Sequence, residues 1–258
     1  MKKINNIVFI GAGNVATNIA VAFKTAGKNI LQVYSRNENN AKYLAVKVDA
    51  SFTDCLLSVV QNADLYIVSV SDTILPVLVN ELNINNNIIV HTSGFQSIDV
   101  LKNVSENYGV LYPLQTFSKN RLVNFSTIPI CIEANNIENT TLLEAFSGII
   151  SNDVKKINSF QRKKIHLAAV FACNFTNYMY DVAQEILKAE NVSFDILKPL
   201  IIETAKKILT QNPFDAQTGP ARRNDNLIVN EHLKMLIDEK YNILYKILSE
   251  NISEKYNK

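Results

Sequence analysis

The chain is predicted to have an α/β fold in which a doubly wound parallel sheet is followed by an all-α C-terminal domain. Over the first part of the chain, short apolar segments alternate with helical patterns, as expected for strands buried on both faces of a parallel sheet. Beyond Phe160, apolar residues recur at three- and four-residue steps, which indicates helices. We therefore expect domains at residues 1–157 and 158–258.

A glycine-rich turn follows the first strand and leads directly into a helix. Gly11, Gly13 and Ala16 give the spacing G-x-G-x-x-A. In this context the first glycine makes the tight turn, the second lets backbone approach a pyrophosphate, and the small third residue lets helix pack on strand. The pattern predicts a Rossmann-type dinucleotide-binding domain with Asn14 and Val15 at the phosphates. The alternative is an ordinary glycine-rich turn.

The second strand is followed by Ser35 and Arg36 and not by an acidic residue. An NAD-binding protein usually places an acid about 20 residues beyond the glycines, where it binds the ribose 2′-hydroxyl. Arg36 lies near that offset and can pair with a 2′-phosphate, while Ser35 donates a hydroxyl. The predicted cofactor is therefore NADP. The alternative is a solvated arginine at a strand end.

Polar residues also follow the next two strong strands, at residues 65–70 and 87–91. Ligands of doubly wound sheets bind at the carboxyl ends of the strands. We therefore expect further cofactor contacts at these strand ends, from Ser69, Val70, Ser71, His91, Ser93 and Gly94. His91 could alternatively cap its strand.

The other expected elements are less strongly patterned. Before residue 160 they are helices at residues 38–45, 54–60, 73–80 and 140–151, and strands at residues 46–48, 110–112, 129–133 and 153–157. Pro129 suggests that its strand lies at a sheet edge. After residue 160 the helical stretches are residues 161–189, 194–209 and 226–252.

Composition argues against several classes of function. The net charge is +2 for 258 residues, and no basic block indicates a nucleic-acid or acidic-membrane partner. No apolar run has the length of a membrane span, and no signal-type segment precedes the first strand, so we expect a cytoplasmic protein. Three widely spaced cysteines and three histidines predict neither a disulfide framework nor a metal site.

The helix that begins near Gln161 is the first candidate for substrate chemistry. On an ideal helix, His166, Cys173 and Asn177 share a face, and Asn174 lies about 80° away. Small residues on the same surface leave room for a ligand, and the helix follows the nucleotide domain, where a substrate cleft is expected. The alternative is helix packing around a satisfied core histidine.

The segment 218–225 is the second candidate. Thr218, Gly219 and Pro220 can expose backbone amides, and Arg222 and Arg223 add two cations that suit an anionic substrate group. The alternative is a solvated helix start.

Taken together, the motifs resemble a known family. They are GAGNVA (11–16), SR (35–36), VSVSD (68–72), HTSG (91–94), YPLQTF (112–117), IHLAAVFACNFTNY (165–178) and TGPARRND (218–225). They are similar to Rossmann-like oxidoreductases with a C-terminal domain of unknown function (DUF2520), relatives of pyrroline-5-carboxylate reductase and of the 6-phosphogluconate and β-hydroxyacid dehydrogenases.

The departures from these relatives limit what the resemblance implies. Cys173, Asn174 and Phe175 stand where pyrroline-5-carboxylate reductase has a Ser/Gly-rich stretch, so its activity is not carried over. The β-hydroxyacid dehydrogenases have a catalytic lysine four residues before an asparagine, and here that position is Val170. Tyr112 stands where the nearest relatives usually have histidine.

We therefore expect an NADP-dependent reductase or dehydrogenase of a small anionic carbonyl, hydroxyl or imine compound held between the two domains. His166 would donate the proton, Asn174 would orient the substrate, and Arg222 or Arg223 would hold its anionic end. The alternative is an NADP-binding sensor that has lost the chemistry. A homodimer is expected through apolar positions of the last helices, Leu233, Leu236, Ile237, Ile243, Leu244, Ile247 and Leu248.

Overall fold

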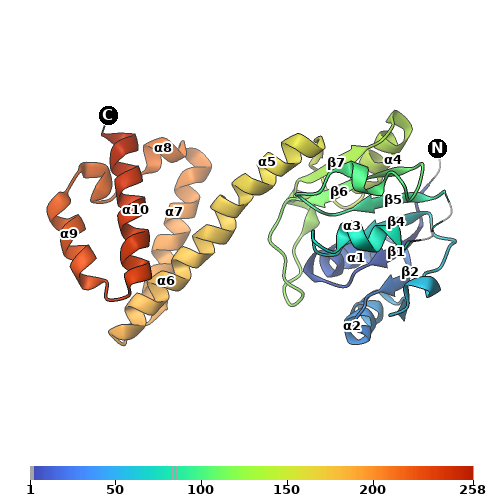
Figure 1. The fold of residues 1–258 in the computed structure, drawn as a ribbon, viewed down its shortest axis with the longest axis horizontal. Helices are drawn as coiled ribbons and strands as arrows, with labels where there is room; N and C mark the ends of the chain where they lie inside the picture. The colour runs from blue at the N-terminus through green and yellow to red at the C-terminus, as the bar shows by residue number, and fades with distance from the viewer. Residues whose placement is uncertain (1–2, 83, 85, 258) are drawn as a thin grey trace. The chain divides into compact units, whose positions relative to one another are not determined.

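The structure is a computed structural model that describes residues 3–82, 84 and 86–257. The chain divides into two compact units, residues 1–173 and residues 174–258. Each unit has its own architecture (Figure 1). The domain boundary expected between residues 157 and 158 falls just before Asn158, the N-cap of helix α5 (Ser159–Ala169). The division into domains at this point stays a prediction.

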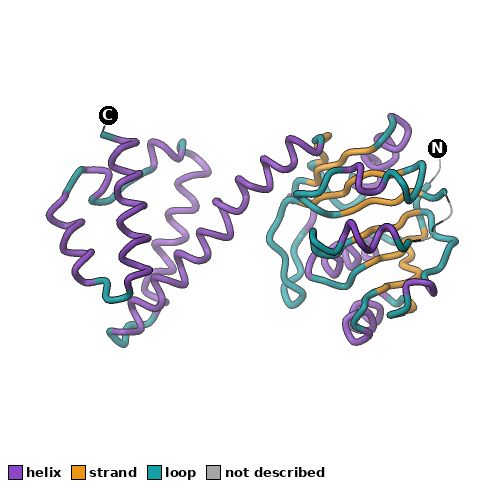
Figure 2. The backbone as a smooth tube through the Cα atoms, in the orientation of Figure 1, coloured by secondary structure: helices purple, strands orange, loops and turns teal. Residues whose placement is uncertain are grey.

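Within the described residues, the first unit is built on an eight-stranded sheet (Figure 2). The strands follow the order β3-β2-β1-β4-β5-β6-β7-β8, and all neighbouring pairs are parallel except β6 and β7. Their bounds are β1 Asn6–Ile10, β2 Asn29–Tyr34, β3 Ser51–Thr53, β4 Leu65–Val68, β5 Ile88–His91, β6 Tyr108–Pro113, β7 Ile130–Ala134 and β8 Val154–Lys156.

Helices cover both faces of this sheet, and the residues of β1 alternate between the two resulting cores. Ile7 and Phe9 are buried in the core that includes side chains of α1, α2 and α4. Val8 and Ile10 are buried in the core that includes α3 and the short helix η2. The bounds are α1 Asn14–Thr25, α2 Glu38–Val48, α3 Leu75–Asn80, η2 Ile98–Leu101, η3 Phe125–Thr127 and α4 Ile137–Ser147. The predicted doubly wound α/β domain is thereby confirmed.

Two elements near α2 differ from the expectation. Residues 46–48, expected as a strand, are the last turn of α2. Leu44 and Val48, one helical turn apart, are both fully buried, so a helix hides these side chains better than an isolated strand would. The helix expected at residues 54–60 is a single 3₁₀ turn, η1 (Leu56–Ser58).

The strand around Pro129 is not an edge strand. β7 pairs antiparallel with β6 and parallel with β8, so β8 forms that edge of the sheet. Pro129 stands just before the first residue of β7. Its missing N–H therefore removes no hydrogen bond from within the strand.

The regular structure described for the second unit is helical, as predicted. The elements are α6 Thr176–Ala189, η5 Phe194–Leu197, α7 Lys198–Thr210, α8 Pro213–Ala216, η6 Ala221–Arg223, α9 Asn226–Met235 and α10 Glu239–Tyr256. The stretch expected at residues 226–252 is two helices, because Asp238 accepts a hydrogen bond from the Lys240 amide and caps α10. None of the helices in the described part of the chain combines the length and apolar character of a bilayer-spanning segment.

A π-helical segment, η4 (Val170–Phe175), joins α5 to α6. A π-helix turns by a smaller angle per residue than an α-helix does. The face calculated for His166, Cys173 and Asn177 with α-helical geometry is therefore wrong beyond Val170. Such segments occur frequently at functional sites.

Candidate active site

The turn between β1 and α1 is shaped by two missing side chains. Gly11 has a φ of 115°, and a Cβ there would lie 2.1 Å from the carbonyl oxygen of Ser69. Gly13 is exposed, and a Cβ there would meet no atom within 4 Å. Gly11 thus permits the close approach of β1 and β4, and Gly13 leaves an open surface above the turn.

The N-terminus of α1 offers its backbone amides to an anion. Gly13 is the N-cap, no side chain caps the helix, and its first turn contains no acidic residue. The amides of Asn14 and Val15 therefore have no partner inside the helix and stand at the positive end of its dipole. The open turn and the uncapped helix fit the pyrophosphate of a dinucleotide cofactor.

The end of β2 carries an unneutralised cation. Arg36 is exposed, and within the described residues its guanidinium makes neither a hydrogen bond nor an ion pair. The hydroxyl of Ser35 accepts a hydrogen bond at 3.4 Å from the amide of Asn37, which in turn caps α2. A free guanidinium beside a hydroxyl fits a 2′-phosphate better than it fits a 2′-hydroxyl.

The hydroxyls after β4 and β5 are mostly used within the protein. The Thr92 hydroxyl donates to that of Ser69 at 3.0 Å. Ser93 donates to Asp72 and accepts from the amides of Phe95 and Gln96. These side chains fix the shape of the loops. The hydroxyl protons of Thr92 and Ser93 are already donated within the protein, so a cofactor contact from these two residues must use other atoms.

Two further positions after β4 were expected to contact the cofactor. Val70 packs against the core that includes α3, and the hydroxyl groups of Ser71 and Thr73 are hydrogen-bonded at 3.3 Å. Their cofactor contacts stay a prediction.

His91 is fully buried at the end of β5, and both of its ring nitrogens are occupied. Nε2 lies 3.3 Å from the carbonyl oxygen of Ser97, and Nδ1 accepts the amide proton of Ser93 at 3.1 Å. Burial, reinforced by the nearby charge of Arg162, lowers the pKa of His91 to about 3, so the ring is neutral. These two bonds are compatible with the strand-capping alternative, and the predicted cofactor contact of His91 stays a prediction.

A second histidine, His166, lies directly against the loop that follows β5. A Cβ at Gly94 would lie 2.7 Å from Nδ1 of His166, so only glycine leaves space for the imidazole. The same Nδ1 lies 3.2 Å from the hydroxyl oxygen of Tyr112, at the end of β6. Three segments, the β5 loop, β6 and α5, thus meet at one partly exposed imidazole.

The hydroxyl of Tyr112 remains a neutral phenol at ordinary pH. Burial raises the pKa of Tyr112 to about 12. The phenol and the imidazole meet edge to face, with ring planes at 76°. Tyr112 is the hydrogen-bond partner of Nδ1 of His166. Nε2, the other ring nitrogen, has no hydrogen-bond partner among the described residues. That nitrogen can exchange a proton with a bound molecule.

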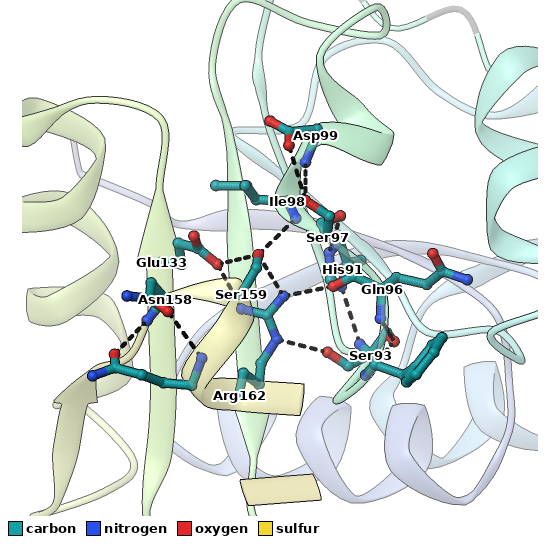
Figure 3. A network of polar contacts seen from close by, with 12 residues as sticks. His91, Ser93, Gln96, Ser97, Ile98, Asp99, Glu133, Asn158, Ser159 and Arg162 are labelled. Atoms are coloured by element: carbon teal, nitrogen blue, oxygen red, sulfur yellow. Dashed lines mark hydrogen bonds and ion pairs between the residues drawn. The ribbon is translucent and has the colours of Figure 1, made fainter. Parts of the chain in front are cut away.

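Arg162 fixes the start of α5 to the sheet and was not identified from the sequence. Its side chain is fully buried and donates to the Glu133 carboxylate at 2.6 Å, on β7. It also donates to the carbonyl oxygens of Ser93 at 3.1 Å and Gln96 at 2.6 Å. Figure 3 shows this guanidinium between the β5 loop and β7, with Ser159 beside it. Arg162 therefore positions α5, and with it His166, one turn further along.

The N-terminus of α5 carries a signal that could have located this network. Asn158 and Gln161 form a capping box, which predicts a helix start four residues before Arg162. Glu133 is the penultimate residue of β7, and the other residues of that strand are apolar. An acid near a strand end and an arginine in the first turn of a later helix are suitable partners. Because α4 and β8 lie between them in the chain, their pairing depends on strand order, which periodicity does not give.

The other predicted catalytic residues belong to the second unit. Asn174 is exposed in η4. Arg222 donates to the carbonyl oxygen of Tyr256 at 3.1 Å and lies over its ring, so it holds the end of α10. Arg223 is exposed. Whether Asn174 and Arg222 approach a substrate stays a prediction.

A cavity of about 570 Å³ lies at the opposite end of the strands from the glycine turn. Its walls include Lys28, which precedes β2, and Phe146 of α4. Because ligands of doubly wound sheets bind at the carboxyl ends of strands, we do not assign this cavity to the cofactor.

Comparison with known proteins identifies the family. A family model described as NADP oxidoreductase, coenzyme F420-dependent, matches residues 6–93, and the domain of unknown function DUF2520 matches residues 128–252. A crystal structure from Bacteroides fragilis, assigned as an NADP oxidoreductase, is 46% identical with a TM-score of 0.92, covering 97% of this chain and 98% of that one. The chain belongs to this family of NADP oxidoreductases.

More distant structures share the fold of this NADP oxidoreductase. An imine reductase from Myxococcus stipitatus in complex with NADP⁺ is 14% identical with a TM-score of 0.66, covering 96% of this chain and 92% of that one. A pyrroline-5-carboxylate reductase from Coxiella burnetii is 15% identical with a TM-score of 0.58, covering 98% and 99%. No protein of curated function matches by sequence.

Family membership confirms three expectations. The resemblance to DUF2520-containing Rossmann-like oxidoreductases is confirmed, the enzyme is an NADP-dependent oxidoreductase, and its cofactor is NADP. The free Arg36 and the uncapped α1 are the features of this chain that fit that cofactor.

Proposed function

We propose that this NADP oxidoreductase acts as a reductase or dehydrogenase of a small anionic carbonyl, hydroxyl or imine compound. The observation that supports this most is the pair formed by Tyr112 and His166, whose Oη and Nδ1 lie 3.2 Å apart at the end of β6. When bound, the nicotinamide would supply or accept the hydride. The protein must then hold the substrate and move a proton.

His166 is the proposed proton donor. In its charged form the imidazole donates Nδ1–H to the Tyr112 oxygen and presents Nε2–H to the substrate. After transfer from Nε2, the ring stays hydrogen-bonded through Nδ1, so its orientation does not change. In the oxidation direction Nε2 takes the proton back. Tyr112 is a positioning residue here, because a phenol with a pKa of about 12 keeps its own proton.

Asn174 and Arg222 are proposed to orient the substrate and hold its anionic end. Arg222 already bonds to the carbonyl oxygen of Tyr256. Its guanidinium has further N–H donors for an anion. Arg223 is the alternative anion holder, and testing Arg222→Gln and Arg223→Gln separately distinguishes the two. The expected result is a raised KM for an anionic substrate in one variant and not in the other.

The cofactor-contact proposal covers all the predicted positions at the ends of β1, β2, β4 and β5. For His91 the contact would come from its backbone, because both ring nitrogens are hydrogen-bonded within the protein. Backbone atoms of Ser69, Ser93 and Gly94 remain part of it. An NMR titration with NADPH tests these positions directly, because the backbone amide signal of each contacted residue should change its chemical shift.

The decisive experiment offers purified protein NADPH and a panel of 2-oxo acids, 3-oxo acids and cyclic imines. We expect oxidation of NADPH with at least one class, and a lower rate in Tyr112→Phe without a change in NADPH affinity. Tight NADPH binding without turnover of any compound would favour the alternative, a catalytically inactive NADP-binding sensor.

We further propose that the enzyme is a homodimer. In the described part of the second unit, α6, α7, α9 and α10 contain no buried residue in a single chain. Large apolar side chains such as Ile237, Ile243 and Ile247 are exposed there. A second copy would cover such surface.

A further inference from the structure

A loop after β6 reaches the cofactor-binding turn. Residues 114–124 leave β6 just beyond Tyr112, and Phe117 and Val123 pack against the core that contains α1. The ring of Phe117 stacks on that of Phe125, with centroids 5.7 Å apart. Asn18 of α1 donates to the carbonyl oxygen of Ser118 at 3.0 Å. The loop is therefore held in place on both sides of Lys119.

Lys119 connects the starts of two helices that flank the cofactor site. Its backbone amide donates to Oδ1 of Asn14, in the glycine turn, at 3.2 Å. Its ammonium donates to Oδ1 of Asn40, in the first turn of α2, at 2.9 Å. The same ammonium lies 5.8 Å from the ring centroid of Tyr43. Lys119 thus lies beside both the pyrophosphate turn and the helix that begins after Arg36.

The surroundings of this ammonium leave its charge unneutralised. Asn40 and Tyr43 are neutral, and within the described residues no carboxylate forms an ion pair with Lys119. The acid nearest in sequence on α2 is Glu38, which is exposed. Two cations, Arg36 and Lys119, therefore flank the N-terminus of α2 from different segments of the chain.

We propose that Lys119 is a second cationic ligand of the 2′-phosphate of NADP and so a determinant of cofactor specificity. Arg36 approaches from the end of β2 and Lys119 from the loop after β6. The 2′-phosphate carries close to two negative charges, which one guanidinium does not neutralise. NADH has no phosphate at this position, so the second cation favours NADPH alone. The proposal rests on the cofactor of the family and not on the proposed substrate.

The test compares NADPH and NADH binding by nucleotide fluorescence in the wild type, Lys119→Met and Arg121→Met. Arg121 is an exposed cation of the same loop and serves as the matched control. We expect Lys119→Met to weaken NADPH binding by about tenfold or more and to leave NADH affinity unchanged. Arg121→Met should have the wild-type affinity for both nucleotides. Lys119→Arg should keep most of the preference for NADPH.

Two results would overturn the proposal. If Lys119→Met weakens the binding of NADPH and NADH equally, Lys119 supports the glycine turn and does not recognise the 2′-phosphate. If neither affinity changes, the ammonium does not reach the cofactor. Lys119→Gln, a shorter neutral variant, replaces Lys119→Met if thermal unfolding shows the latter to be misfolded. Failure of the proposed reductase activity would instead appear as absent turnover with the NADPH preference intact.

Discussion

The Arg162 guanidinium and the Glu133 carboxylate form a buried ion pair of 2.6 Å that joins the first turn of α5 to β7. The same guanidinium also donates to two backbone carbonyl oxygens of the β5 loop and to the hydroxyl of Ser159. This arrangement holds the β5 loop, the sheet and α5 in one geometry. The position of His166 against Gly94 follows from it.

Removal of the guanidinium should therefore destabilise the protein strongly. Arg162→Met removes the ion pair of the partly buried Glu133 carboxylate, which among the described residues keeps only the Ser159 hydroxyl, and removes a donor from two carbonyl oxygens. We expect a loss of about 3–5 kcal/mol in the free energy of unfolding, measured with urea. Lys164→Met, on an exposed neighbour in the same helix, should change it by less than about 0.5 kcal/mol. A loss in Arg162→Met no larger than in this control would show that the network carries no stability.

Gly94→Ala tests the contact with His166 directly. The added methyl would lie 2.7 Å from Nδ1, so either the imidazole moves or the loop does. We expect a cost of about 1–3 kcal/mol in unfolding free energy and changed NMR chemical shifts of the His166 ring. Unchanged ring chemical shifts and unchanged stability would mean that the two residues are not in contact in solution.

His91 predicts a pH dependence of stability. Its pKa is lowered to about 3 in the folded protein, from an ordinary value of 6.5, so the unfolded chain binds more protons between these values. Stability from this group is complete above about pH 6.5 and falls with a limiting slope of about 1.4 kcal/mol per pH unit as the pH drops towards 3. Urea unfolding at several pH values measures it.

The control for this pH dependence is the exposed His232. His91→Gln should remove the slope attributed to the buried ring, whereas His232→Gln should retain it. Equal slopes in the wild type and in His91→Gln would assign the pH dependence to other groups.

Cofactor preference gives a further prediction. Arg36→Ala should cost about 1.5–3 kcal/mol in NADPH binding and leave NADH binding nearly unchanged, because the free guanidinium has only the 2′-phosphate to pair with. Isothermal titration with both nucleotides checks this. Equal affinities for NADPH and NADH in the wild type would contradict it.

Assembly is tested by mass. Sedimentation equilibrium at micromolar concentration, with NADPH present, should give a dimer, and Ile247→Glu should shift the distribution towards monomer because Ile247 is exposed in the single chain. A monomer mass for the wild type would rule out the predicted homodimer.

Sequence patterns located the parts of the fold that depend on local spacing. Gly11 marks the turn because a side chain there would collide with the carbonyl oxygen of Ser69, and the buried run of β1 follows from its apolar residues. Val48 was misplaced because a short apolar segment suits a strand or a helix end equally well. The antiparallel β7 and the pairing of Arg162 with Glu133 depend on the order of strands in space, which no local pattern specifies.

The candidate site divides in the same way. The position of Arg36 could be predicted from its offset to the glycines. The hydrogen bonds of the His91 ring to Ser93 and Ser97 could not be predicted, because a histidine at a strand end is equally suited to a ligand and to capping. Its contact with the cofactor stays a prediction. The contact of Tyr112 with His166 joins residues that are 54 positions apart, beyond any local pattern.

The central claim is that His166 transfers the proton while the nucleotide site works independently of it. The most direct measurement is the turnover of His166→Ala on the first compound of the panel that the wild type reduces, together with its NADPH affinity. We predict a fall in turnover of about a hundredfold or more, with unchanged NADPH affinity and a folded protein. Wild-type turnover in His166→Ala, or loss of folding in that variant, would contradict the claim and return His166 to a packing role.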